Sequence, residues 1–97
     1  MTVTKKIENT GATIFVEGRV DTNTAPDFEK EIQSLFSLES LVIDFSKLDY
    51  ISSAGLRVLL SAHKQFSQKK GLKLININDF VLEVFEVTGF KEILDIE

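Results

Sequence analysis

The stretch Leu41-Val-Ile-Asp-Phe45 is short, apolar and rich in β-branched residues. Its length and composition are typical of a strand that is buried on both faces. A polar segment over residues 46–53 follows and is predicted to be a loop anchored by Tyr50 and Ile51. Residues 54–68 then place large apolar side chains at helical spacing, at Leu56, Leu59, Leu60 and Phe66. A buried strand that leads into an amphipathic helix indicates an α/β fold.

The N-terminal residues predict an antiparallel pair of strands. Val3–Glu8 and Ala12–Val20 are β-branched, partly alternating runs. Between them, Asn9-Thr10-Gly11 suits a hairpin because Asn and Gly tolerate positive φ. One face of the second run is apolar and is expected to point into the core; it consists of Ala12, Ile14, Val16 and Val20.

A first helix is predicted to begin at Thr24-Ala-Pro-Asp27. Thr24 can cap it, and Pro26 lacks only an N–H that the first turn of a helix leaves unpaired. An apolar stripe at helical spacing continues this helix to an end within residues 37–39; it consists of Phe28, Ile32, Leu35 and Phe36.

The C-terminal third predicts a further strand, a helix and a short edge strand. Gly71 is expected to close the helix of residues 54–68, and residues 72–77 form the next strand. Asn78 or Asp79 caps a third helix that carries Val81, Val84 and Phe85 and stops at Gly89, and residues 93–96 add an edge strand. Strands that alternate with helices imply parallel pairing, so we expect a mixed sheet of four or five strands with an N-terminal antiparallel hairpin, parallel core strands and three or four helices. All 97 residues form one predicted domain.

Composition disfavours several classes of protein. The chain has no cysteine, so disulfide scaffolds and thiolate metal sites are excluded. Its net charge is −4, and its densest basic stretch (Lys64, Lys69, Lys70 and Lys73) is typical of a solvated helix end, so nucleic-acid binding has little support. No segment resembles a signal peptide or a membrane span, which favours a cytoplasmic protein.

Few residues could support catalysis. His63 is the single histidine and falls near the apolar face of the helix of residues 54–68, which favours a partly buried structural role. Asp21, Asp44 and Asp49 sit near strand ends, where a metal or phosphate could bind, although ordinary loops also place carboxylates there. The five glycines form no phosphate-binding motif. A small metal-dependent enzyme remains a minor alternative.

Two hydroxyl groups precede the second helix. Ser52 and Ser53 stand just before Ala54 and Gly55, so accessible backbone N–H groups and the helix dipole favour negative charge there. One interpretation is a helix N-cap in a tight turn. The other is a phosphoacceptor, whose phosphate the fold would tolerate at a helix N-terminus.

The segment Val42-Ile-Asp-Phe-Ser-Lys-Leu-Asp-Tyr-Ile-Ser-Ser-Ala-Gly-Leu-Arg-Val-Leu-Leu60 resembles the central motif of the STAS domain, and specifically that of the small single-domain anti-sigma factor antagonists of bacteria. Gly18-Arg-Val-Asp-Thr-Asn-Thr-Ala25 resembles the segment that leads into the family's first helix. Phe85-Glu-Val-Thr-Gly-Phe90 resembles the end of its last helix. The resemblance spans the whole chain.

This resemblance implies a regulator without catalytic activity and without a cofactor or metal. In the family, the unphosphorylated antagonist binds an anti-sigma factor that is also a serine kinase and thereby releases the sigma factor. The kinase phosphorylates the antagonist with its own ATP, and a serine phosphatase reverses the modification. Carried onto this chain, the acceptor is Ser53, or less favourably Ser52. Many antagonists have Asp directly before the acceptor, where this chain has Ser52.

The resemblance also implies a binding surface for the kinase. The residues expected to form it are Asp21, Thr22, Asn23, Thr24, Tyr50, Ile51, Ser52, Ser53, Ala54, Gly55, Leu56 and Arg57. The protein is expected to be a monomer that contacts neither nucleic acid nor membrane. The alternative is a STAS subunit in a stress-signalling, transporter or other complex that does not control a sigma factor. The C-terminal segment is expected to pack over Phe80, Leu82 and Val87; the alternative is that these residues form a second contact patch.

Overall fold

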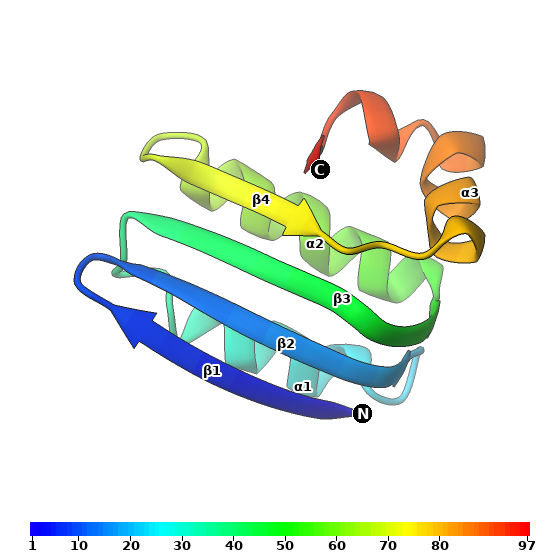
Figure 1. Cartoon of the computed structure of the whole chain (residues 1–97), viewed down its shortest axis with the longest axis horizontal. Helices are drawn as coiled ribbons and strands as arrows, with labels where there is room; N and C mark the ends of the chain where they lie inside the picture. Colours follow the sequence, from blue (N-terminus) through cyan, green and yellow to red (C-terminus); the bar gives the residue numbers. More distant parts are fainter.

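The structure is a computed structural model that describes residues 1–97, and it contains one five-stranded sheet (Figure 1). The strands lie in chain order, β1 (Thr2–Glu8), β2 (Gly11–Val20), β3 (Ser40–Ile51), β4 (Gly71–Ile75) and β5 (Asp95–Ile96). β1 pairs with β2 antiparallel, and every other pair is parallel. The predicted mixed sheet with an N-terminal antiparallel hairpin is confirmed.

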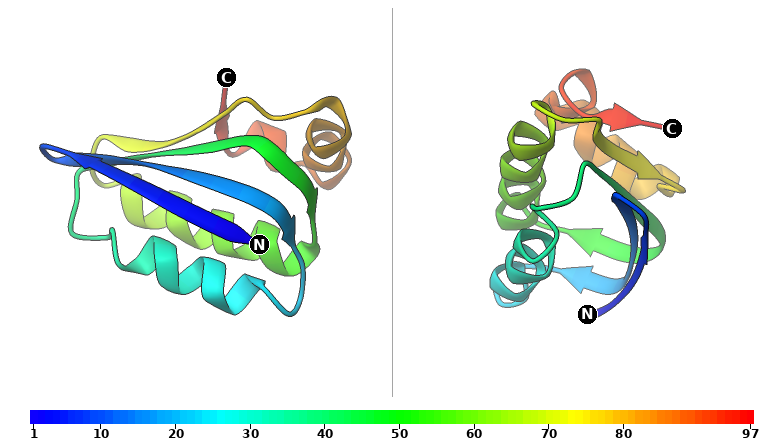
Figure 2. Two further views of the ribbon diagram at one scale, coloured as in Figure 1. Left: turned by 60° about the horizontal axis from the view of Figure 1, so that its bottom comes forward. Right: turned by 90° about the vertical axis from the view of Figure 1, so that its left-hand side faces the viewer.

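Three α-helices and one 3-10 helix complete the fold. They are α1 (Ala25–Gln33), α2 (Ser53–Phe66), α3 (Asp79–Thr88) and η1 (Phe90–Glu92). α1 and α2 lie side by side against one face of the sheet, whereas α3 lies at one end of it (Figure 2). None of the helices is long and apolar enough to cross a membrane.

The core lies between the sheet and the pair α1 and α2. Alternate residues of β2 (Ala12, Ile14 and Val16) are buried, as the pattern predicted, together with Val20 at the strand end. They meet Phe28 and Ile32 from α1 and Leu56, Leu59 and Phe66 from α2, all of which are buried. The opposite face of the sheet carries no helix (Figure 2).

The loop predicted over residues 46–53 is wrong, because β3 continues to Ile51. β2 is long enough to keep pairing with β3 through Arg19 opposite Tyr50 and Val20 opposite Ile51. Two irregularities in the register of β2 and β3 let this pairing continue. Leu48 and Ile51 are buried on the core side, so the polar segment is anchored as a strand.

The ends of the first two helices also differ from the sequence prediction. α1 ends at Gln33 rather than within residues 37–39, since the Ser34 hydroxyl donates to the Glu31 carbonyl oxygen at 2.7 Å and competes with helix continuation. Leu35 is nevertheless buried in the turn that follows. α2 ends at Phe66, and Gly71 does not close it but begins β4 with φ of 108°.

The third helix begins and ends as predicted. The Asn78 Oδ1 accepts a hydrogen bond from the Val81 N–H at 2.8 Å and caps α3. Gly89 ends the helix with φ of 81°, a conformation that favours glycine. The Asn78 side-chain amide also donates to the Leu48 carbonyl oxygen at 2.8 Å, which fixes the start of α3 beside β3.

Candidate functional site

Two of the segments singled out from the sequence meet at the C-terminal ends of β2 and β3. The Ser52 N–H donates to the Val20 carbonyl oxygen at 2.8 Å, directly after the last paired residues of the two strands. The loop from β2 to α1 and the junction from β3 to α2 therefore lie next to each other. The sequence prediction placed these segments on one surface, and the structure brings them together.

The two serines of the junction have different surroundings. Ser52 is the N-cap of α2, in extended conformation, and its Oγ accepts from the Gly55 N–H at 3.4 Å. Its carbonyl oxygen accepts from the Leu56 N–H at 2.9 Å, so both oxygens of this half-buried residue serve the first turn of the helix. Ser53 is the first helical residue and is exposed. Ser52 is therefore the N-cap of α2, and Ser53 is the more exposed of the two residues.

The loop from β2 to α1 is held by hydrogen bonds around one carboxylate. Asp21 Oδ1 accepts from the Asn23 N–H and the Thr24 N–H, each at 3.0 Å, and from the Thr24 hydroxyl at 3.2 Å. The hydrogen bond from the Thr24 N–H, followed by that from Asn23, holds the pKa of Asp21 below its ordinary value. Thr24 stands at the N-cap of α1 but makes no side-chain cap, because its Oγ1 instead accepts from the Asp21 N–H at 2.8 Å.

Arg19 joins the two segments and was missed by the sequence prediction. Its guanidinium carbon lies 4.4 Å from the centre of the Tyr50 ring, and its Nε lies 3.9 Å from Asp21 Oδ2. The stack depends on Arg19 pairing with Tyr50 across a register shift that follows Gly18, whose φ is 89°. No local sequence signal reveals this pairing, because both residues owe it to strands that are distant in the chain.

Three residues of the predicted binding surface are buried beneath it. Ile51 and Leu56 belong to the core, and Gly55 is buried where α2 approaches the ends of β2 and β3. A Cβ on Gly55 would lie 2.7 Å from both Ile51 Cγ1 and Val20 Cγ1, so only glycine permits this approach. These three residues lie beneath the surface, and the remaining nine predicted residues are exposed or half-buried.

The carboxylates considered as a metal site are not gathered into one. Asp44 lies within β3 and accepts from the Ser46 N–H at 2.8 Å and from the Asn76 amide at 3.0 Å. Burial of Asp44 acts to raise its pKa, whereas these hydrogen bonds act to lower it. The hydrogen bonds together are stronger, so the pKa of Asp44 lies below its ordinary value. No group of three histidine, aspartate or glutamate residues is placed to hold a metal ion. His63 is half-buried on α2, as predicted.

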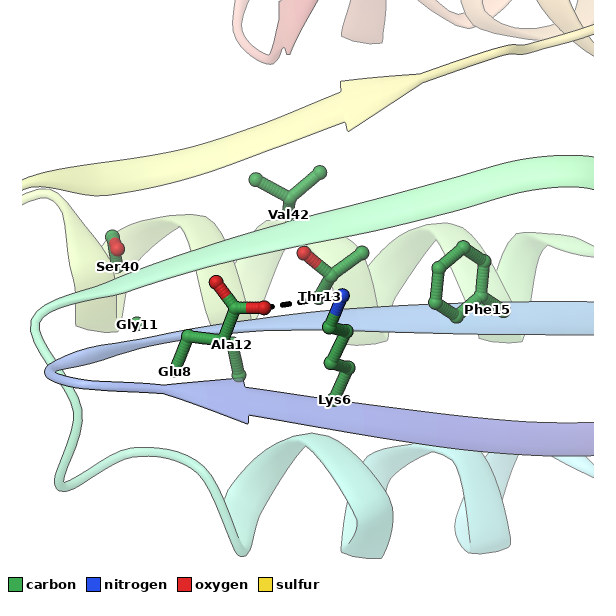
Figure 3. Close-up of a pocket in the computed structure, with 8 residues that line it drawn as sticks. All are labelled: Lys6, Glu8, Gly11, Ala12, Thr13, Phe15, Ser40 and Val42. Carbon is green, nitrogen blue, oxygen red and sulfur yellow. Dashed lines mark ion pairs between the residues drawn. The ribbon is translucent and has the colours of Figure 1, made fainter.

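The hollows of the surface lie elsewhere. The largest, of about 400 Å³, is on the face of the sheet that no helix covers, beside the Lys6–Glu8 ion pair and Phe15 (Figure 3). Another lies along α3 and is almost wholly apolar. The C-terminal segment does not cover the residues there as predicted, since Phe80 is 57% and Val87 is 81% exposed, while Leu82 is half-buried. Neither hollow includes Ser53.

The chain is similar to a known family and to curated proteins. The family model of the STAS domain matches residues 2–97. The anti-sigma-B factor antagonist of Listeria monocytogenes is 33% identical over an alignment of 87 residues, and the match covers 87% of this chain and 76% of that protein.

Solved structures agree in fold. An anti-sigma factor antagonist from Mycobacterium paratuberculosis superposes with a TM-score of 0.88 at 22% identity, covering 98% of this chain and 83% of that one. The Bacillus cell fate determinant SpoIIAA in its phosphorylated form has a TM-score of 0.75 at 15% identity, covering 99% of this chain and 91% of that one. At these identities the likeness concerns the fold.

Proposed function

The chain belongs to the STAS domain family, and from this we propose that it is an anti-sigma factor antagonist whose binding is switched off by phosphorylation of Ser53. Its unphosphorylated form binds an anti-sigma factor that is also a serine kinase, and the sigma factor is released. The name of the Listeria relative supports the antagonist role. Within this chain, the observation that carries the proposal is the exposed Ser53 hydroxyl beside the ordered loop of residues 21–24.

The choice of Ser53 over Ser52 rests on the capping geometry. A kinase must align the acceptor hydroxyl with the terminal phosphate of ATP. The acceptor side chain must therefore be free to turn away from its own domain and toward the kinase. The Ser52 hydroxyl is half-buried and accepts from the Gly55 N–H, so its transfer to a kinase would remove the cap of α2. Ser53 takes part in none of the side-chain hydrogen bonds of the structure, so it has none to give up. Ser52 stands where many antagonists have Asp, and it caps α2, the helix that begins at Ser53.

The switch follows from the placement of the phosphate. A phosphoserine carries a charge of about −1.5 to −2 at neutral pH, and at the first position of α2 it interacts favourably with the helix dipole. The domain therefore stays folded. Within an interface, the same dianion must lose its water, which costs several kcal/mol unless the partner supplies a counter-charge. A loss of only about 2.7 kcal/mol weakens binding about a hundredfold.

This function makes the chain a regulatory binding protein rather than an enzyme. It needs no cofactor of its own, because the partner kinase uses the ATP, and a serine phosphatase restores the binding form. Such a regulator works in the bacterial cytoplasm and as a monomer, without direct contact to nucleic acid.

The test mixes the protein and ATP with candidate anti-sigma factor kinases from the same genome. Binding is measured first, and phosphorylation is then measured by intact mass and peptide mapping. We expect one added phosphoryl group of about 80 Da that maps to Ser53 and is absent in Ser53→Ala. The matched control is Ser52→Asn, since asparagine caps a helix but offers no hydroxyl group.

Three results would contradict the proposal in different ways. Phosphate that persists in Ser53→Ala and disappears in Ser52→Asn would move the acceptor to Ser52. A kinase that binds the chain without modifying it would indicate a constitutive antagonist. If no anti-sigma factor binds, the chain serves a STAS complex of another kind.

A further inference from the structure

The arginines of this chain are distributed unevenly. There are two, Arg19 and Arg57, and both lie in the segments that form the candidate surface. None of the nine lysines falls within residues 19–24 or 49–57. Protein interfaces are enriched in arginine and depleted in lysine, because the planar guanidinium binds carboxylates in a bidentate manner and is weakly hydrated. The two arginines of these segments are thus cations of the type that interfaces use.

Arg19 is held in place before any partner binds. The Tyr50 ring lies beneath its guanidinium at 4.4 Å, and Asp21 approaches its Nε at 3.9 Å. Nevertheless the side chain remains 60% exposed, so most of it is open to solvent. A cation that is fixed but accessible loses less conformational entropy on binding than a free side chain.

The two carboxylates within residues 19–24 and 49–57 do not neutralise the charge of both arginines. Arg57 is exposed on α2, one helical turn after Ser53, and takes part in none of the ion pairs of the structure. Asp21 uses its Oδ1 for hydrogen bonds within its own loop. Asp49 is the remaining carboxylate of these segments and is exposed.

We propose that Arg19 and Arg57 bind carboxylates on the anti-sigma factor, so that the docking surface of the partner is acidic. This inference rests on the proposed function and specifies its partner. It also explains the direction of the switch. A phosphate on Ser53 faces the acidic groups of the partner and is repelled by them, while Arg57, at the i+4 position, pairs with the phosphate and is withdrawn from the partner.

The test measures affinity as a function of ionic strength. The probe is the anti-sigma factor that binds the unphosphorylated wild-type chain, and dissociation constants are measured between roughly 50 and 300 mM salt. Arg19→Gln and Arg57→Gln are each expected to weaken binding roughly tenfold or more and to make the salt dependence shallower. Asp49→Asn removes a charge that opposes an acidic partner and is expected to tighten binding, roughly twofold.

The matched control is Lys6→Gln. Lys6 is also an exposed cation in an intramolecular ion pair, at 3.1 Å from Glu8, but it lies on the edge strand β1. Its loss is expected to leave affinity within roughly twofold of wild type. Thermal unfolding of each variant separates a binding effect from a loss of stability.

A purely structural role of Arg19 gives a different result. If Arg19→Gln weakens binding but the salt dependence is unchanged, Arg19 positions the loops and does not meet a carboxylate, and the proposal is overturned. It is also overturned if Asp49→Asn weakens binding, or if a kinase binds and phosphorylates Ser53 while both arginine variants bind normally. In that last case the proposed function stands. If no anti-sigma factor binds the wild-type chain, both conclusions are rejected together.

Discussion

Gly55→Ala tests whether the first turn of α2 is held against the strand ends as closely as the structure indicates. The added methyl group would lie 2.7 Å from Val20 Cγ1 and 2.7 Å from Ile51 Cγ1. Both neighbours are buried, at 0% and 2% exposure, and both are β-branched, so they have few alternative rotamers. The methyl group therefore has to displace either these side chains or the helix itself.

Two opposing terms determine the expected magnitude. Overpacking of a filled core costs about 1–3 kcal/mol. Alanine in place of glycine inside a helix contributes about 1 kcal/mol in the other direction. We expect a net loss of about 1 kcal/mol in the free energy of unfolding, measured by urea denaturation. For a domain of this length, the midpoint of thermal unfolding then falls by about 4–8 °C.

Two further variants isolate the steric term. Ser61→Ala changes an exposed position of the same helix, where no clash arises, and is expected to be neutral or slightly stabilising. In a Val20→Ala background one of the two contacts is gone, so Gly55→Ala should cost at least about 0.5 kcal/mol less than in wild type. The reasoning is refuted if Gly55→Ala stabilises the protein by the full helix-propensity gain, or if the two substitutions are strictly additive.

Two other expectations concern Ser52 and Asp44. Ser52→Ala removes the cap of α2 and is expected to lower stability by about 1 kcal/mol, whereas Ser52→Asn retains most of it; equal losses in thermal unfolding would argue against the cap. The folded pKa of Asp44 lies below its ordinary value of 3.8, so its contribution to stability is present above that value and is lost as the pH falls through the folded pKa. Urea denaturation at about pH 6 and about pH 3 should therefore show a smaller acid loss in Asp44→Asn than in wild type, and identical losses would count against the hydrogen bonds from Ser46 and Asn76.

Much of the candidate site could be recognised without the structure. Ser52 and Ser53 stood out because hydroxyl groups before small residues and an apolar helical stripe are a local pattern. The division of roles between them could not be predicted, since it depends on which hydroxyl reaches the Gly55 N–H. Likewise, Ile51 and Leu56 were assigned to the surface because the motif contains them, but the packing of α2 against the strand ends buries both.

The sequence by itself determined the order and type of the elements, the inward face of β2 and the start and end of α3. These features depend on hydrophobic periodicity and on capping residues that act within a few positions of one another. Only the tertiary structure decided that residues 46–51 form a strand, that Arg19 lies on Tyr50 and that Gly55 has no room for a side chain. The strand over residues 46–51 and the stack of Arg19 on Tyr50 depend on the register between β2 and β3. The lack of room at Gly55 depends on the packing of α2 against these two strands. The physical reason is that these contacts join segments about thirty residues apart in the chain.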